Sequence, residues 1–115
     1  MEEKRRYIRV NTPVLVEFPH PETMKTERSF TTDVSETGLK FPTTVKLPVG
    51  QDVPLTLQLP FLSQPMHATG QVMWVRQISR LGAPQYEIGM KFQWVDDPDR
   101  HRLMNHLTTF FPGRE

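Results

Sequence analysis

The sequence contains no cysteine. Disulfide bonds and thiolate metal sites are therefore excluded, which fits a reducing compartment. The chain also has no apolar run close to the roughly 20 residues that cross a bilayer as a helix. Its N-terminus begins with charged residues in place of the apolar region of a signal peptide. We therefore expect a cytoplasmic protein that does not insert into membranes.

A strong excess of positive charge is missing as well. The chain has 14 basic and 13 acidic residues, which give a formal net charge of +1. A domain that wraps a nucleic acid backbone is far more basic, so we do not expect nucleic acid as the partner. The positive charge that exists is gathered near the N-terminus, at Lys4, Arg5, Arg6 and Arg9. Such a basic run on its own is usually a solvated tail.

Two short motifs carry most of the chemical information. Arg5 and Arg9 form an Arg-x-x-x-Arg pair, and Asp33, Ser35 and Gly38 follow as Asp-x-Ser-x-x-Gly. A guanidinium group pairs with two phosphate oxygens or with the O6 and N7 edge of guanine. Asp33 offers the acceptor that the N1 and N2 donors of guanine need, and Ser35 offers a hydroxyl. Gly38 lets the backbone approach a ligand closely or turn with positive φ. Together the motifs predict recognition of a guanine-bearing phosphodiester.

The two motifs differ in specificity. The arginine pair is a weak signal, because Arg76 and Arg80 repeat its spacing without a partner motif. Asp-x-Ser-x-x-Gly is sharper, since a chain of this length contains it by chance on the order of a few per cent of the time. The functional interpretation therefore depends on the two motifs occurring together and in this order.

These residues resemble the PilZ domain, a family whose members bind the bacterial second messenger cyclic di-GMP. The likeness lies in residues 3–10 and 33–39, and residues 70–75 and 88–92 are similar to the last strands of the family. It thus extends over nearly the whole chain. It implies cyclic di-GMP as the ligand, with no cofactor and no metal. The ligand-binding residues that it implies are Arg5, Arg9, Asp33, Ser35 and Gly38, with Arg6 as a further candidate.

Apolar residues alternate with polar ones in several segments, which predicts β-strands. The 11 prolines fall mainly between these segments and exclude long helices through the middle of the chain. About six strands with turns between them predict a closed antiparallel barrel. We therefore expect a mainly β fold, a six-stranded PilZ-type β-barrel with a C-terminal helix packed on it. The clearest strand patterns are at 14–18, 30–34, 53–59, 72–76 and 86–94.

The chain is expected to form a single domain over residues 1–115. Within it we expect a flexible arginine arm at 1–10, the barrel at 11–95 and a helix at 97–111. Asp97 is a suitable cap for that helix, Pro98 suits its first turn, and Asp99 complements the positive end of its dipole. Its apolar stripe is predicted to pack on the barrel and consists of Leu103, Met104, Leu107, Phe110 and Phe111.

Other side chains receive a structural interpretation. Trp74 and Trp94, with Phe92, occupy alternating strand positions that are usually core, although stacking of bases on these rings is the alternative. The four histidines are scattered along the chain, without the spacing of a metal pair. Ser35 lacks a recognisable base partner. We therefore do not expect an enzyme.

Three functional hypotheses follow. The first is a stand-alone cyclic di-GMP receptor whose arginine arm becomes ordered on binding and passes the signal to an unidentified protein effector. The second is a PilZ-fold adaptor that binds only protein, which the retained motifs disfavour. The third is a single-stranded nucleic acid binder using Trp74, Trp94 and the basic arm, which the low net charge disfavours.

Overall fold

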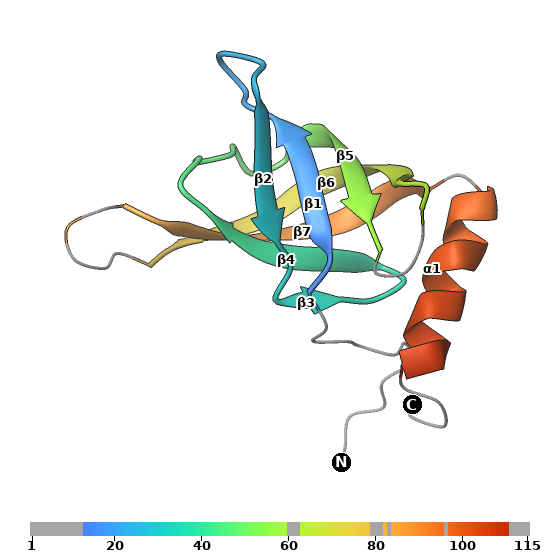
Figure 1. Cartoon of the computed structure of the whole chain (residues 1–115). Helices are drawn as coiled ribbons and strands as arrows, with labels where there is room; N and C mark the ends of the chain where they lie inside the picture. Colours follow the sequence, from blue (N-terminus) through green and yellow to red (C-terminus); the bar gives the residue numbers. More distant parts are fainter. Residues whose placement is uncertain (1–12, 60–62, 79–81, 83, 96, 111–115) are drawn as a thin grey trace.

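The structure is a computed structural model and describes residues 13–59, 63–78, 82, 84–95 and 97–110. Within these residues, one antiparallel sheet of seven strands is followed by a single helix, α1 (Asp97–Phe110) (Figure 1). The strand order across the sheet is β2-β1-β5-β6-β7-β4-β3. The strands are β1 (Leu15–Pro19), β2 (Thr26–Phe30), β3 (Asp33–Val34), β4 (Gly38–Thr43), β5 (Asp52–Gln58), β6 (Met66–Gln77) and β7 (Tyr86–Val95).

The expected mainly β fold with a C-terminal helix is confirmed, but the sheet has seven strands and not six. The difference arises at 30–34, where one strand was predicted and the structure has the end of β2, a break and β3. The amide of Thr31 still donates to the Val14 carbonyl, at 2.9 Å, whereas the amide of Thr32 donates to Lys40 in β4, also at 2.9 Å. The chain thus changes partner strand at this point. Thr31 points inward and Phe30 is left 60% exposed.

The sheet curls on itself without a complete hydrogen-bonded closure. Within the described residues β2 pairs only with β1, although it curls round toward β4. The Ser29 hydroxyl donates to the carbonyl of Pro42 in β4, at 2.5 Å. Pro42 has no amide hydrogen to donate in return, so a ladder cannot pass through this position. The expected closed barrel is therefore a curled, open sheet with a side-chain hydrogen bond between its first and last parts.

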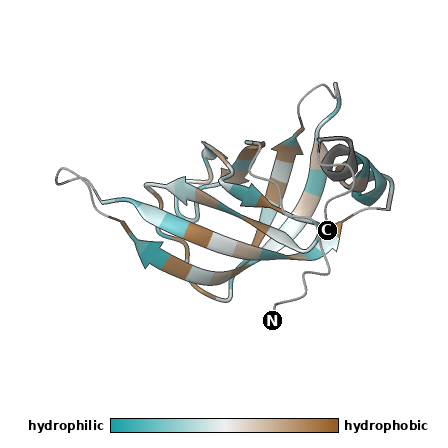
Figure 2. Cartoon of the chain, turned by 90° about the horizontal axis from the view of Figure 1, so that it is seen from below, coloured by the Kyte–Doolittle hydropathy of each residue, from teal (hydrophilic) through white to brown (hydrophobic). Residues whose placement is uncertain are grey.

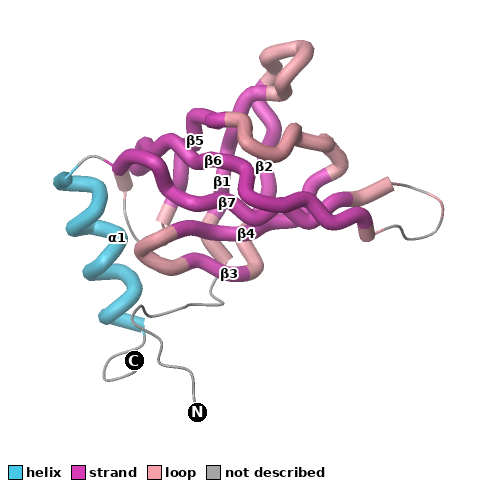
Figure 3. The backbone as a smooth tube through the Cα atoms, turned by 180° about the vertical axis from the view of Figure 1, so that it is seen from behind, coloured by secondary structure: helices cyan, strands magenta, loops and turns pink. Residues whose placement is uncertain are grey.

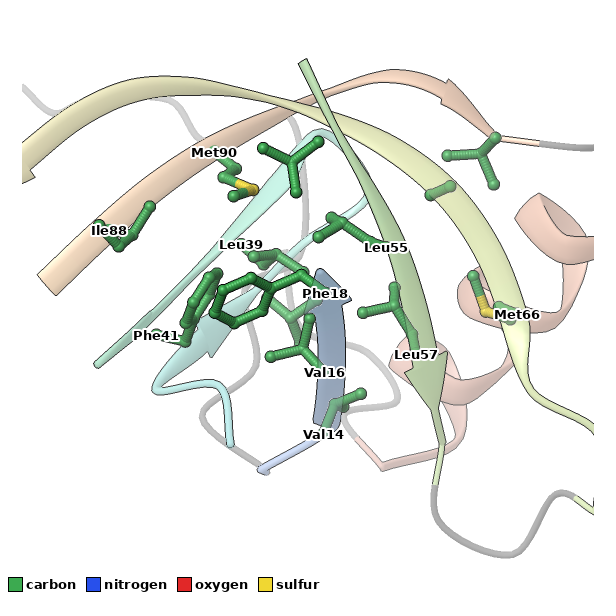
Figure 4. Close-up of a cluster of buried hydrophobic side chains, with 14 of the residues drawn as sticks. Val14, Val16, Phe18, Leu39, Phe41, Leu55, Leu57, Met66, Ile88 and Met90 are labelled. Atoms are coloured by element: carbon green, nitrogen blue, oxygen red, sulfur yellow. The ribbon is translucent and has the colours of Figure 1, made fainter. Parts of the chain in front are cut away.

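The core lies inside the curl. Hydrophobic and hydrophilic residues alternate along the strands (Figure 2), and this pattern places one apolar face toward the interior. Side chains from β1, β4, β5, β6 and β7 point toward one another there (Figure 4). The rings of Phe18 and Phe41 pack at 5.3 Å between centroids with an interplanar angle of 43°. Burial of each large apolar side chain contributes about 1.5–3 kcal/mol.

Helix α1 lies along one side of the sheet, at the opposite end from the protruding β6–β7 hairpin (Figures 1 and 3). Leu103 is buried and belongs to the core cluster. Asp99 accepts a hydrogen bond from the His67 amide at the start of β6, at 3.0 Å, and one from Arg102, at 2.5 Å. Arg102 also donates to the carbonyls of Gln64 and Pro65, at 3.0 Å each. Asp99 therefore attaches the helix to β6, beyond the dipole role that the sequence predicts.

Burial raises the pKa of the Asp99 carboxyl, but the hydrogen bond from the His67 amide and the Arg102 guanidinium outweigh burial and lower that pKa below its ordinary value. The carboxylate is consequently the form that the folded protein stabilises. Within the described residues no helix is long and apolar enough to cross a membrane.

Candidate functional site

The Asp-x-Ser-x-x-Gly motif forms a tight hairpin between β3 and β4. Asp33 pairs with Lys40 across the two strands, and the Ser35 amide donates to the Gly38 carbonyl at 2.9 Å. The Ser35 hydroxyl lies 3.1 Å from the Thr37 hydroxyl and accepts a hydrogen bond from the Thr37 amide at 3.3 Å. The hydroxyl of Ser35 thus stabilises the turn that carries it, which is typical of serine in turns.

Gly38 is required by the approach of β4 to β7. A Cβ atom at this position would lie 2.1 Å from the carbonyl oxygen of Met90. The Thr37 carbonyl accepts from the Phe92 amide at 2.8 Å, which holds the turn against β7. Gly38 is not among the described glycines with positive φ, so of its two suggested roles, close backbone approach or a positive-φ turn, the turn does not apply. Its small size serves the contact with the neighbouring strand.

Trp74 is brought to the outer face of the sheet by a β-bulge. Val72 pairs with Met90 and Trp74 with Gly89, so Met73 is the extra residue on β6. The Trp74 ring lies over the bare backbone of Gly89, where an added Cβ would be 2.2 Å from the ring atom Cε2. Trp74 is nevertheless 41% exposed.

The prediction that both tryptophans lie in the core is therefore wrong. A second register shift leaves Gln93 unpaired on β7, and Trp94 beyond it is 56% exposed on the outer face. Each bulge inserts one residue and so reverses the face of every residue that follows. Phe92 lies just before the second bulge, so its face is unchanged. Its side chain packs against the buried cluster, as expected.

A pocket of about 280 Å³ opens where this hairpin meets the tryptophan. The three described motif residues line it together, and the sheet beneath them contributes one aromatic ring and two cations. The lining includes Asp33, Ser35, Gly38, Trp74, Lys40 and Lys91. Lys40 and Lys91 were not predicted as site residues, and Trp74 was named only as an alternative stacking surface for nucleic acid bases. The sequence signal for the two lysines is their position, Lys40 on the strand that begins at Gly38 and Lys91 on the neighbouring strand β7.

The charges around this pocket form a small network. Glu87 accepts a hydrogen bond from Arg76 and lies 3.9 Å from the Lys40 ammonium, measured from its Oε2. Lys91 makes no ion pair with another residue in the described part of the chain. The pocket thus combines an acceptor, a hydroxyl, an aromatic surface and a cation, Lys91, that has no ionic partner among the described residues. This set suits a planar base with an attached phosphate.

The other predicted ligand residues, Arg5, Arg6 and Arg9, lie outside the described residues. Among the residues that are described, no group of three histidine or carboxylate side chains is arranged to hold a metal ion. The expectation that the chain is not an enzyme stays a prediction.

The chain belongs to the PilZ domain family, because the family model matches residues 3–109. No curated protein matches it significantly. Solved structures do. The PilZ domain of YcgR from Escherichia coli, with c-di-GMP, has a TM-score of 0.67 at 14% identity, over 93% of this chain and 91% of that one.

Two longer proteins give similar values. The inhibitor of motility MotI/DgrA from Bacillus subtilis has a TM-score of 0.74 at 14% identity, over 99% of this chain and 55% of that one. The K. pneumonia MrkH–c-di-GMP complex has a TM-score of 0.75 at 16% identity, over 95% and 53% of the respective chains. The present chain therefore spans about half the length of these two proteins. At such identities the likeness shows a shared fold.

Proposed function

We propose that this chain is a receptor for cyclic di-GMP and that the pocket between the β3–β4 hairpin and Trp74 holds one guanine. The observation that carries the proposal is that Asp33, Ser35 and Gly38 line the same pocket as an exposed aromatic ring. Family membership and the two c-di-GMP-bound structures of similar fold support it.

Each group of the pocket has a defined task in this proposal. The Asp33 carboxylate accepts from guanine N1 and N2, and the Ser35 hydroxyl contacts the base edge or the phosphate. The face of Trp74 that does not cover Gly89 stacks on the base, an interaction worth about 1–3 kcal/mol. A pocket of about 280 Å³ accommodates little more than one base, so the rest of the ligand lies over its rim.

Arg5 and Arg9 are proposed to grip the phosphates and the guanine edge that the pocket leaves uncovered, with Arg6 as an additional contact. Guanidinium groups suit both tasks because their donors form a planar fork. The contact between the ligand and this segment changes the surface that the domain offers to a protein effector. A ligand can transmit a signal only if it interacts more strongly with one state of the protein than with the other.

Isothermal titration calorimetry of cyclic di-GMP into the purified protein tests the proposal. Saturable binding is expected for the natural protein, and Arg5→Ala and Arg9→Ala are each expected to weaken it by at least ~2 kcal/mol, the scale of lost charge-assisted hydrogen bonds. GTP serves as the ligand control. Arg100→Ala removes an exposed helical arginine and serves as the protein control. A folded protein that takes up no cyclic di-GMP would contradict the proposal and favour a protein-only adaptor.

One observation favours a second candidate function, the binding of single-stranded nucleic acid. Trp74 and Trp94 are both exposed on the outer face of the sheet, where bases can stack on them. Oligonucleotide binding with a steep dependence on salt concentration would support this candidate. Binding that is weak and insensitive to salt would exclude it.

A further inference from the structure

We infer that Glu87 sets the charge selectivity of the pocket, so that it accepts a phosphodiester and disfavours a ligand with a terminal phosphate monoester. This inference rests on the proposed function. It concerns a residue outside both motifs, and it predicts discrimination between cyclic di-GMP and its linear form, in which one ring bond has been hydrolysed.

Glu87 lies beside the pocket on the outer face of the sheet. It pairs with Arg76 of β6 on one side and with Pro42 of β4 on the other. Two residues further along β7, in the next row of the same face, Gly89 pairs with Trp74 and with Lys40, which both line the pocket. Glu87 is thus one row away from the surface on which the guanine is proposed to stack.

The carboxylate of Glu87 is held between two cations. Its Oε1 accepts from Arg76, and its Oε2 lies 3.9 Å from the Lys40 ammonium. The side chain of Glu87 is only 12% exposed, whereas those of Lys40 and Arg76 are 38% and 66% exposed. A partly buried charge is less screened by salt than a fully exposed one, so its field reaches the neighbouring pocket.

Among the described residues on this side of the site, the positive and negative charges come close to balancing each other. Three cations, Lys40, Lys91 and Arg76, face two carboxylates, Asp33 and Glu87, and three minus two leaves +1. Each of the two phosphodiesters of cyclic di-GMP carries a single negative charge, so this side of the site balances one of them, and Arg5 and Arg9 are proposed to contact the rest of the ligand. A terminal monoester carries about −1.5 to −2 at neutral pH, and the excess is repelled by Glu87.

The test compares two probes, cyclic di-GMP and the linear dinucleotide with a 5′-phosphate, by titration at 0.15 M salt. In Glu87→Gln, the affinity for the linear probe relative to the cyclic one is expected to rise about three- to tenfold, the range that one partly screened charge produces. Glu17→Gln is the matched control. Glu17 is a partly exposed carboxylate in an outer-face ion pair with Arg28, at 2.6 Å, and it does not line the pocket.

Lys40→Gln provides an independent variant. It leaves Glu87 less neutralised, so the relative affinity for the linear probe is expected to fall. If Glu87 only held the strands together, its replacement would change thermal stability but leave the ratio of the two affinities unaltered, and that outcome overturns the inference. Absence of cyclic di-GMP binding in the natural protein would instead overturn the proposed function, and the inference with it.

Discussion

At the scale of single residues, the two exposed tryptophans offer a natural comparison. Trp74 and Trp94 lie on the same outer face, on neighbouring strands, and are 41% and 56% exposed. Only Trp74 lines the pocket that contains Asp33 and Ser35. Trp94 lines a different groove, together with Thr69 and His67. The proposed function therefore assigns base stacking to Trp74 alone.

Trp74→Ala is expected to weaken cyclic di-GMP binding by about 1–3 kcal/mol, because the stacking surface for the base is lost. Trp94→Ala removes an equally large exposed ring and is expected to leave the affinity unchanged. Calorimetric titration of both variants checks the prediction, and thermal unfolding verifies that they are folded. Equal losses in the two variants would argue for nonspecific stacking along the whole face.

These positions also show which site residues a sequence can identify. The spacing of two residues predicts that Asp33 and Ser35 share a side of a strand, and both line the pocket. This prediction needs no knowledge of the partner strand. The faces of Trp74 and Trp94 depend on bulges at Met73 and Gln93. A bulge is defined by the register of two strands, so alternation along one strand cannot reveal it.

At the scale of elements, the β3–β4 hairpin depends on how closely β4 packs on β7. The Gly38 backbone lies against the Met90 carbonyl, and the Thr37 carbonyl accepts from Phe92. The Ser35 hydroxyl is bonded within the same turn. A change in the β4–β7 spacing therefore moves a pocket-lining residue as well as a strand.

Gly38→Ala is expected to destabilise the fold by about 1–3 kcal/mol, since a Cβ at 2.1 Å from a backbone oxygen forces β4 away from β7. Urea denaturation measures the loss. Thr44→Ala, at an exposed position just after β4, is the control and is expected to change stability by less than about 0.5 kcal/mol. A Gly38→Ala variant as stable as the natural protein would show that the strands adjust without strain.

The break between β2 and β3 could not be predicted from the alternation of residues along the chain. Alternation across 30–34 matched one continuous strand, yet Phe30 faces solvent and Thr31 faces the interior. The Thr31 hydroxyl accepts from the Val14 amide at 2.9 Å, and this buried bond satisfies the amide just before the start of β1. The chain therefore turns where a polar side chain is needed inside, a requirement set by a residue 17 positions away.

At the scale of the whole molecule, the curled sheet and helix α1 are joined by a small polar cluster. Asp99 accepts from the His67 amide, and Arg102 ties the helix to the Gln64 and Pro65 carbonyls. The helix itself could be predicted from its caps and apolar stripe. Its attachment to β6 could not, because Asp99 and His67 are 32 residues apart and meet only once the sheet has formed.

The charge state of Asp99 makes this attachment sensitive to acid. The pKa of Asp99 is lowered in the folded state from an ordinary value near 3.8. The stability that the Asp99 carboxylate contributes is therefore complete above that value, and it is lost as the pH falls through the lower pKa of the folded state.

Asp99→Asn is expected to lower the free energy of unfolding by about 1–3 kcal/mol at neutral pH. The gap between the natural protein and Asp99→Asn should then narrow below about pH 4, where the natural carboxylate also becomes protonated. Denaturation curves at several pH values measure this gap, with Asp52→Asn, an exposed carboxylate on β5, as the control. If this difference in the free energy of unfolding stayed constant down to the lowest pH at which the protein folds, Asp99 would stabilise the fold by its packing and not by its charge.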